Sequence, residues 1–119
     1  MTKPELTKYR SLRFSQWVRE KLPDSSTGFS VSDLDFILMN FKTKKVMFLE
    51  VKLKDGQVSW NQYNMWSLMS KWITRGVGES WEYLGFHLIQ FTGLDFEDGK
   101  VKLDNKFVTE EELIKFLSF

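Results

Sequence analysis

The most constraining stretch of this chain is residues 32–54, SDLDFILMNFKTKKVMFLEVKLK, in which two apolar runs flank a short turn rich in lysine. Side chains two residues apart in a strand point to the same face of a sheet. Because each run is apolar at consecutive positions, both of its faces are apolar through the middle, which is typical of strands covered on both sides. Charged residues gather at the ends away from the turn. The stretch therefore predicts a buried hairpin with one polar end.

The length of the turn decides which charged side chains meet at that end. A two-residue loop over residues 42–43 places Asp35 directly opposite Glu50, whereas a four-residue loop over residues 42–45 places Asp35 opposite Lys52. Directly opposed side chains lie about 4.5–5.5 Å apart at Cβ, so one ion or one water can bridge them. A loop of odd length without a bulge would send the two sets of charges to opposite faces. The sequence leaves the two even registers open.

Helical and extended patterns follow one another along the rest of the chain. Residues 5–22 and 60–74 carry apolar residues at helical spacing, and a capping box of Ser59 with Gln62 opens the second. Residues 81–91 are apolar on both faces, and the order strand, helix, strand predicts a parallel neighbour in the sheet. Short strands and a final helix are expected further on, from turn and cap signals at Asp98-Gly99, Asn105-Lys106, and Thr109 with Glu112.

Length and composition fit one domain and exclude several kinds of site. A chain of 119 residues suits a single α/β domain, residues 1–119, with a mixed central sheet of four to five strands flanked by helices. There is no cysteine and only one histidine, His87, which excludes thiolate sites and multi-histidine zinc sites. We interpret His87 as a hydrogen-bonded core or edge residue. Catalysis would therefore depend on carboxylates and lysine.

Charge and aromatic content indicate where partners could bind. The net charge is only +1, so no field of the whole molecule indicates nucleic acid. Basic residues cluster locally over residues 10–21 and 42–45, as candidates for phosphate contact or as ordinary solvated surface. Five Trp and eleven Phe are many for one small core, which points to a homodimer. No apolar run reaches the length of a membrane span, so we expect a soluble, cytoplasmic protein with no membrane partner.

Three segments carry a resemblance to a known family. They are Asp-Leu-Asp-Phe-Ile-Leu at 33–38, Phe-Leu-Glu-Val-Lys at 48–52, and a helix that opens Ser-Trp-Asn-Gln at 59–62. In this order the chain resembles the PD-(D/E)XK superfamily of restriction endonuclease-like nucleases over about residues 29–91, including Holliday-junction resolvases and phage nucleases. Leu34 stands where the family name has proline, a substitution that the family tolerates. The resemblance implies a restriction endonuclease-like core of αβββαβ-type order.

The same resemblance assigns roles to five residues. Asp35 and Glu50 would bind Mg²⁺, with Mn²⁺ able to substitute, because hard divalent ions prefer carboxylate oxygens and water. The backbone carbonyl of Val51 would add a further oxygen ligand. Lys52 would orient or deprotonate the attacking water or stabilise the charge of the transition state. Gln62 would support the site from the start of its helix.

Each of these residues also has a structural interpretation. Asp35, Glu50 and Lys52 could form a cross-strand salt bridge at a wet sheet end, worth about 0–1 kcal/mol if exposed. Gln62 completes a capping box and needs no further role. We interpret Asp33 as a solvated residue at the strand end, with a second metal ligand as the alternative.

An N-terminal-helix glutamate often joins the metal site in this family, and Glu5 and Glu20 are the candidates for that position. The sequence alone does not align either one. We expect a Mg²⁺-dependent deoxyribonuclease that acts as an endonuclease on DNA, of phage or mobile-element origin by resemblance. The alternative is a non-catalytic nucleic-acid-binding or assembly protein that retains the nuclease fold.

Overall fold

The computed structural model describes residues 12–119, and a boundary between Val31 and Ser32 divides them into two compact units. The described part of the first unit contains the helix α1 (Leu12–Lys21) and a 3-10 helix, η1 (Ser25–Thr27). This confirms the C-terminal part of the helix expected over residues 5–22. Its beginning, with the candidate Glu5, lies outside the described residues.

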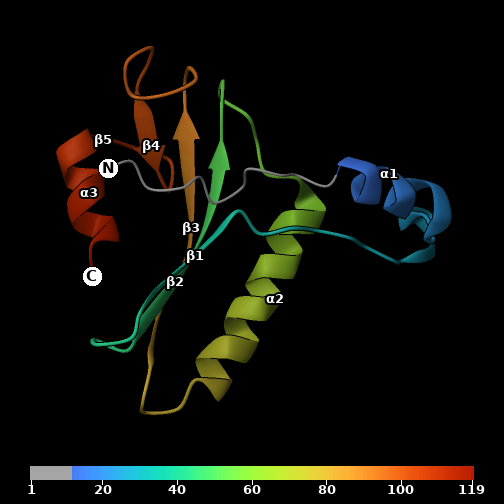
Figure 1. The fold of residues 1–119 in the computed structure, drawn as a ribbon, viewed down its shortest axis with the longest axis horizontal. Helices are drawn as coiled ribbons and strands as arrows, with labels where there is room; N and C mark the ends of the chain where they lie inside the picture. Colours follow the sequence, from blue (N-terminus) through green and yellow to red (C-terminus); the bar gives the residue numbers. More distant parts are fainter. Residues whose placement is uncertain (1–11) are drawn as a thin grey trace. The chain divides into compact units, whose positions relative to one another are not determined.

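The second unit is an α/β structure built on one five-stranded sheet (Figure 1). The strands lie in the order β1-β2-β3-β4-β5, and β2 and β3 are parallel while the other neighbours are antiparallel. This confirms the mixed sheet and the parallel neighbour expected for the second strand. The bounds are β1 (Phe36–Asn40), β2 (Lys45–Lys52), α2 (Trp60–Gly76), β3 (Glu82–Phe91), β4 (Val101–Leu103), β5 (Lys106–Val108) and α3 (Glu110–Leu117).

The order of the elements differs from the αβββαβ type. Two strands, β1 and β2, stand between α1 and α2, where three were expected. Residues 22–35 form no strand, because turn formers such as Pro23 and Gly28, with φ of 89° at Gly28, interrupt any extended run. Asp33 and Leu34 also precede β1, so the first strand begins later than its alternating pattern indicated.

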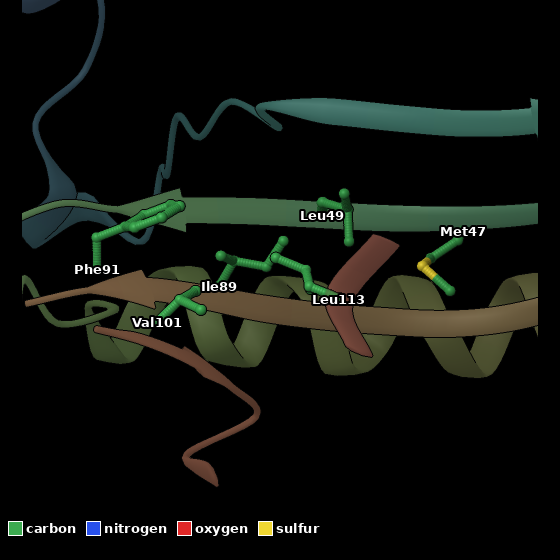
Figure 2. Close-up of a cluster of buried hydrophobic side chains, with 6 residues drawn as sticks. All are labelled: Met47, Leu49, Ile89, Phe91, Val101 and Leu113. Atoms are coloured by element: carbon green, nitrogen blue, oxygen red, sulfur yellow. The ribbon is translucent and has the colours of Figure 1, made fainter. Parts of the chain in front are cut away.

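The two faces of the sheet pack against different helices (Figure 1). On one face, Trp66 of α2 stacks on Phe86 of β3 with ring centroids 4.1 Å apart, and Ser70 shares a hydrogen bond of 2.7 Å with Tyr83. On the other face, Leu113 of α3 joins the main hydrophobic cluster. Figure 2 shows this cluster, whose members are Met47, Leu49, Ile89, Phe91, Val101 and Leu113.

A bulge in β3 decides which of its side chains face α2. The parallel pairing of β2 with β3 shifts by one residue, from Val46 opposite Tyr83 to Phe48 opposite Phe86. Gly85 lies within the shift at φ 95°, a conformation that favours glycine. As a result Tyr83 and Phe86, three residues apart, both point toward α2.

The C-terminal part follows the sequence signals with one exception. A tight turn at Asp104 and Asn105, both with positive φ, joins β4 to β5, and Thr109 and Glu112 form the expected capping box of α3. Asp98-Gly99 lies in the connection of an antiparallel β3–β4 hairpin, and β4 forms at the expected strand of residues 100–103. The connection spans residues 92–100 instead of a tight turn, and the other strand that the sequence indicated, around Phe96, does not form. None of the described helices combines the length and the apolarity needed to cross a membrane.

Candidate functional site

The turn of the β1–β2 hairpin is organised by Asn40. Its Oδ1 accepts hydrogen bonds from the backbone N–H groups of Lys42 and Thr43, at 2.9 and 3.2 Å, and its carbonyl accepts from the N–H of Lys44 at 2.8 Å. Lys44 adopts φ 59°, which closes the turn. The short polar side chain of Asn40 thus replaces the glycine that many hairpin turns use.

The register of this hairpin places Asp35 opposite Glu50. The pairs run without a shift from Asn40 with Lys45 to Phe36 with Leu49, so the next position brings Asp35 across from Glu50. This is the arrangement that a two-residue loop predicted, and the alternative with Asp35 opposite Lys52 is wrong. The two carboxyl groups therefore meet at the end of the hairpin away from the turn.

Asp35 is held in place by the backbone of the opposite strand. Its Oδ2 accepts a hydrogen bond from the N–H of Val51 at 2.9 Å. The N–H and C=O groups of one strand residue point to the same side, so the Val51 carbonyl is also directed toward β1. Since β1 begins at Phe36, opposite Leu49, this carbonyl lies beyond the last pair of the β1–β2 ladder. Asp35 and the Val51 carbonyl are therefore both at the end of the hairpin away from the turn.

Glu50 is buried on the face of the sheet that packs against α2. Its side chain is 3% exposed, and its Oε2 has no hydrogen-bond partner among the described residues. Burial, followed by a hydrogen bond to Asp35 and the negative charge of Asp35, raises the pKa of Glu50 from 4.5 to about 8. Lys52 lowers this pKa, whereas the exposed Asp33 raises it slightly. A buried acid with a free oxygen and a neighbouring carboxylate is a site where a cation would be stabilised.

Lys52 shares the Glu50 face and is positioned by the segment that follows β2. A Cβ added to Gly56 would lie 3.4 Å from Lys52 Cβ and 3.8 Å from Lys52 Cδ, so the lysine stem packs closely beside this glycine. The segment is fixed to the end of β3 by two backbone hydrogen bonds, from Lys54 to Gly93 and from Asp55 to Phe91, each 2.9 Å.

Gln90 is a buried residue of this face that the sequence reasoning missed. It is 3% exposed and pairs in register with Lys52, and its Nε2 donates to the carbonyl of Gly56 at 3.0 Å. Its Oε1 has no partner within the described part of the chain. The available signal was the single amide among the apolar residues 88–91 at the end of β3.

Gln62 takes part in the cap of α2 and in none of the hydrogen bonds described above for Asp35, Glu50 and Gln90. Gln62 Oε1 accepts from the N–H and the hydroxyl of Ser59, each at 3.3 Å, which confirms the capping box of α2. None of its hydrogen bonds in the described structure reaches Asp35 or Glu50, so its support of the site stays a prediction. Glu20 lies in α1 and accepts from Gln16 at 3.0 Å.

His87 has the structural role that its sequence position indicated. It points away from the carboxylates, on the face covered by α3, where its ring meets Phe116 edge to face at 4.9 Å. Its Nδ1 lies 2.6 Å from Asp104 Oδ2, and its Nε2 lies 2.8 Å from the carbonyl of Leu84. Both nitrogens are occupied, so His87 is unsuited to bind a metal.

The oxygen atoms at the hairpin end fit a small divalent ion. Among the described residues no three Asp, Glu, His or Cys side chains come together as a ready metal cage. Mg²⁺ does not require such a cage, because it keeps several waters and uses one or two carboxylates. Asp35, Glu50 with its unpartnered Oε2, and the Val51 carbonyl supply oxygen donors only, which suits Mg²⁺ or Mn²⁺.

Comparison of the chain with protein-family models, with curated proteins and with solved structures finds no match.

Proposed function

We propose that this protein is a metal-dependent DNA endonuclease whose centre is formed by Asp35, Glu50 and Lys52. The observation that carries the proposal is the buried Glu50, which faces Asp35 across the hairpin and keeps one oxygen without a partner. Exposed surface salt bridges do not bury a carboxylate in this way. A carboxylate pair with a lysine on the same face suits the hydrolysis of a phosphodiester.

Each residue of the centre has a separate task in this proposal. Asp35, Glu50 and the Val51 carbonyl hold Mg²⁺ or Mn²⁺, and the hydrogen bond from the Val51 N–H fixes the orientation of Asp35. When bound, such an ion lowers the pKa of a water and polarises the scissile phosphate. Lys52 places a positive charge where negative charge develops on the phosphate oxygens, and its stem is confined beside Gly56.

Part of the fold supports a restriction endonuclease-like core, although two strands instead of three precede α2. An antiparallel hairpin carries the carboxylates, a helix follows it, and the next strand pairs in parallel with the second strand of the hairpin. DNA as the substrate follows from the resemblance to PD-(D/E)XK nucleases. The lysines of the hairpin turn, Lys42, Lys44 and Lys45, offer phosphate contacts at the opposite end of β2.

A cleavage assay with matched lysine variants tests this function. The purified chain is incubated with labelled duplex, single-stranded, flap and branched DNA, and with RNA, in Mg²⁺ or Mn²⁺. Lys52→Met should lower the rate by at least about 100-fold, the usual scale for a catalytic proton-transfer or charge-stabilising side chain, while Mn²⁺ binding persists. Lys115→Met, which changes an exposed lysine of α3 on the other face of the sheet, should cleave at nearly the wild-type rate.

Two results would contradict the proposal. One is a wild-type protein that cleaves none of these substrates with either ion. The other is cleavage by Lys52→Met at the rate of the Lys115→Met control, which would mean that the activity comes from another site or another protein.

The open edge of the sheet supports the homodimer expected from the composition. β1 is an edge strand of five residues without charge or proline, and Ile37 and Met39 are 55% and 48% exposed. Edge strands of this kind favour pairing with another strand. A groove of about 550 Å³ lies between β1 and the C-terminal residues Leu117 and Phe119.

The occupant that fits this edge is β1 of a second copy. Antiparallel pairing about Leu38 would place Ile37 opposite Met39 of the second copy. It would also bring the acidic residues 33–35 of each copy beside the lysines at residues 42–45 of the other. Apolar groups would then meet at the centre and opposite charges at both ends.

The rival function, a non-catalytic nucleic-acid-binding or assembly protein, has one observation in its favour. Three large aromatic residues of α2 are exposed, Trp60, Tyr63 and Trp72, which is more exposed aromatic surface than a helix of a monomer usually presents. DNA binding without cleavage in any of the assays above would favour this rival.

A further inference from the structure

Gln90 is a buried amide with one end satisfied and the other end free. Only 3% of the residue is exposed, and within the described structure Oε1 lacks any hydrogen-bond partner. A buried polar atom without a partner costs about 1–3 kcal/mol, so such atoms call for an explanation. Gln90 stands in β3 where an apolar residue would avoid this cost.

The orientation of the Gln90 amide follows from its contact with Gly56. The backbone carbonyl of Gly56 can only accept a hydrogen bond, so the group 3.0 Å away from it must be the Nε2 donor. Exchanging the two ends of the amide would set two acceptors against each other. The free end is therefore the oxygen, an acceptor.

The position of Gln90 in the sheet places it beside the proposed ion site. It pairs in register with Lys52, and Glu50 pairs two residues earlier with Leu88, so Gln90, Lys52 and Glu50 share the face that packs against α2. Both atoms that lack partners, Glu50 Oε2 and Gln90 Oε1, thus belong to one face and to neighbouring strands. Lys52 makes no hydrogen bond to either oxygen.

We infer that Gln90 is part of the ion-binding site: its Oε1 accepts a hydrogen bond from a water in the shell of the divalent ion that Asp35 and Glu50 hold. The inference rests on the proposed function. A hydrated ion supplies what each free oxygen needs, a metal bond for Glu50 and a water hydrogen for Gln90. The bond to Gly56 fixes the amide for this task and links the segment after β2 to the site. Mutation of a residue that hydrogen-bonds to a ligand of a metal ion usually lowers the affinity for that ion by about 10- to 100-fold.

Binding of Mn²⁺ to the full chain, followed by electron paramagnetic resonance of the free ion, tests the inference without using activity. Gln90→Met removes the acceptor at similar length and should weaken Mn²⁺ binding by about tenfold. Gln90→Glu keeps an oxygen and adds a charge, so it should bind Mn²⁺ more tightly by about threefold or more, because charge-assisted hydrogen bonds are stronger. Gln57→Glu adds the same charge on an exposed residue of the nearby segment and measures the long-range effect of charge alone.

The opposite signs of the two variants separate a binding role from a structural one. Both variants lose the donor to Gly56, so a residue that only fixes this segment would give weaker binding in both, or no change in either, and would overturn the inference. A gain in Gln90→Glu no larger than that in Gln57→Glu would also overturn it. If Gln90→Met does not fold, the comparison of the two glutamate variants decides.

A further variant, Glu50→Gln, shows whether a negative result overturns only the role of Gln90 or the proposed ion site as a whole. Glu50→Gln should abolish Mn²⁺ binding if the ion site exists. Wild-type protein that binds no Mn²⁺, or binds it as well as Glu50→Gln does, overturns both proposals. Binding that depends on Glu50 and is unaffected by Gln90 overturns only the inference about Gln90.

Discussion

Replacement of Glu50 by glutamine should make the protein more stable at high pH when no divalent ion is present. The side chain is buried next to Asp35, and these surroundings raise the pKa of Glu50 from 4.5 to about 8. Between these pH values the side chain of Glu50 is therefore protonated in the folded state and ionised in the unfolded state. Glutamine resembles the protonated acid in shape and can donate a hydrogen bond to Asp35 without titrating.

The pKa shift fixes the sign and the scale of the effect. An acid whose pKa is higher in the folded state contributes stability below its unfolded pKa, and this contribution is lost as the pH rises through the folded value. The free energy of unfolding of the wild type should thus fall between about pH 4.5 and pH 8, by at most about 1.4 kcal/mol per pH unit. The whole shift corresponds to roughly 4–5 kcal/mol as an upper limit, a large part of the stability of a small domain.

Urea unfolding at a series of pH values in the presence of a chelator measures this difference. Glu50→Gln should match the wild type near pH 5 and exceed it progressively up to about pH 8, whereas the exposed Glu97→Gln should follow the wild type throughout. Mn²⁺ should then stabilise the wild type at pH 8 and leave Glu50→Gln unchanged, because bound ligands stabilise only the state that binds them. Parallel curves for the wild type and Glu50→Gln would refute the argument that Glu50 is a buried, protonated acid.

Three further predictions concern the dimer and the fold. Met39→Lys should convert a dimer to a monomer in analytical ultracentrifugation, whereas Phe107→Lys on the opposite edge strand should not, and a wild type that sediments as a monomer would contradict the β1 interface. Gly85→Ala should lower the free energy of unfolding by at least about 1 kcal/mol, because φ is 95° and the new Cβ would lie 3.3 Å from His87 Nε2. The control Gly76→Ala has open space around the new Cβ and should leave the free energy of unfolding unchanged or raise it. Ser59→Ala removes the N-cap of α2 and should lower the free energy of unfolding, measured by thermal unfolding, by about 1 kcal/mol. An unchanged free energy of unfolding would contradict the assignment of Ser59 as the cap.

The hairpin was predictable because its two faces are apolar and only its ends are charged. That pattern fixed the strands and limited the register to two even choices, one of which the structure adopts. The choice between them depended on Asn40, whose side chain accepts from the N–H groups of Lys42 and Thr43. Asparagine tolerates many turn geometries, so the sequence alone could not select the turn that closes the hairpin.

The start of β1 was predicted too early for a related reason. Asp33 and Asp35 continue the alternation of the strand, yet a strand also requires a partner for its backbone, and the ladder with β2 ends at Phe36. Asp35 instead uses its side chain to bind the N–H of Val51. The alternation of apolar and polar residues predicts which side chains share a face of the sheet. It does not predict where the hydrogen-bonded pairing of the backbone ends.

The position of Gln90 shows why part of the site could not be read from periodicity. In a regular strand every second side chain points to the same face. Gln90 would then share a face with Phe86 and Leu84, and Tyr83 would point to the other face. The bulge at Gly85 breaks this count, so that Tyr83, Phe86 and Gln90 all face α2. Only with the bulge do both anchors of α2, Ser70 on Tyr83 and Trp66 on Phe86, lie on the face that also carries Glu50. One glycine therefore puts the two residues that anchor α2, Tyr83 and Phe86, on the same face as the carboxylate and the amide of the proposed ion site.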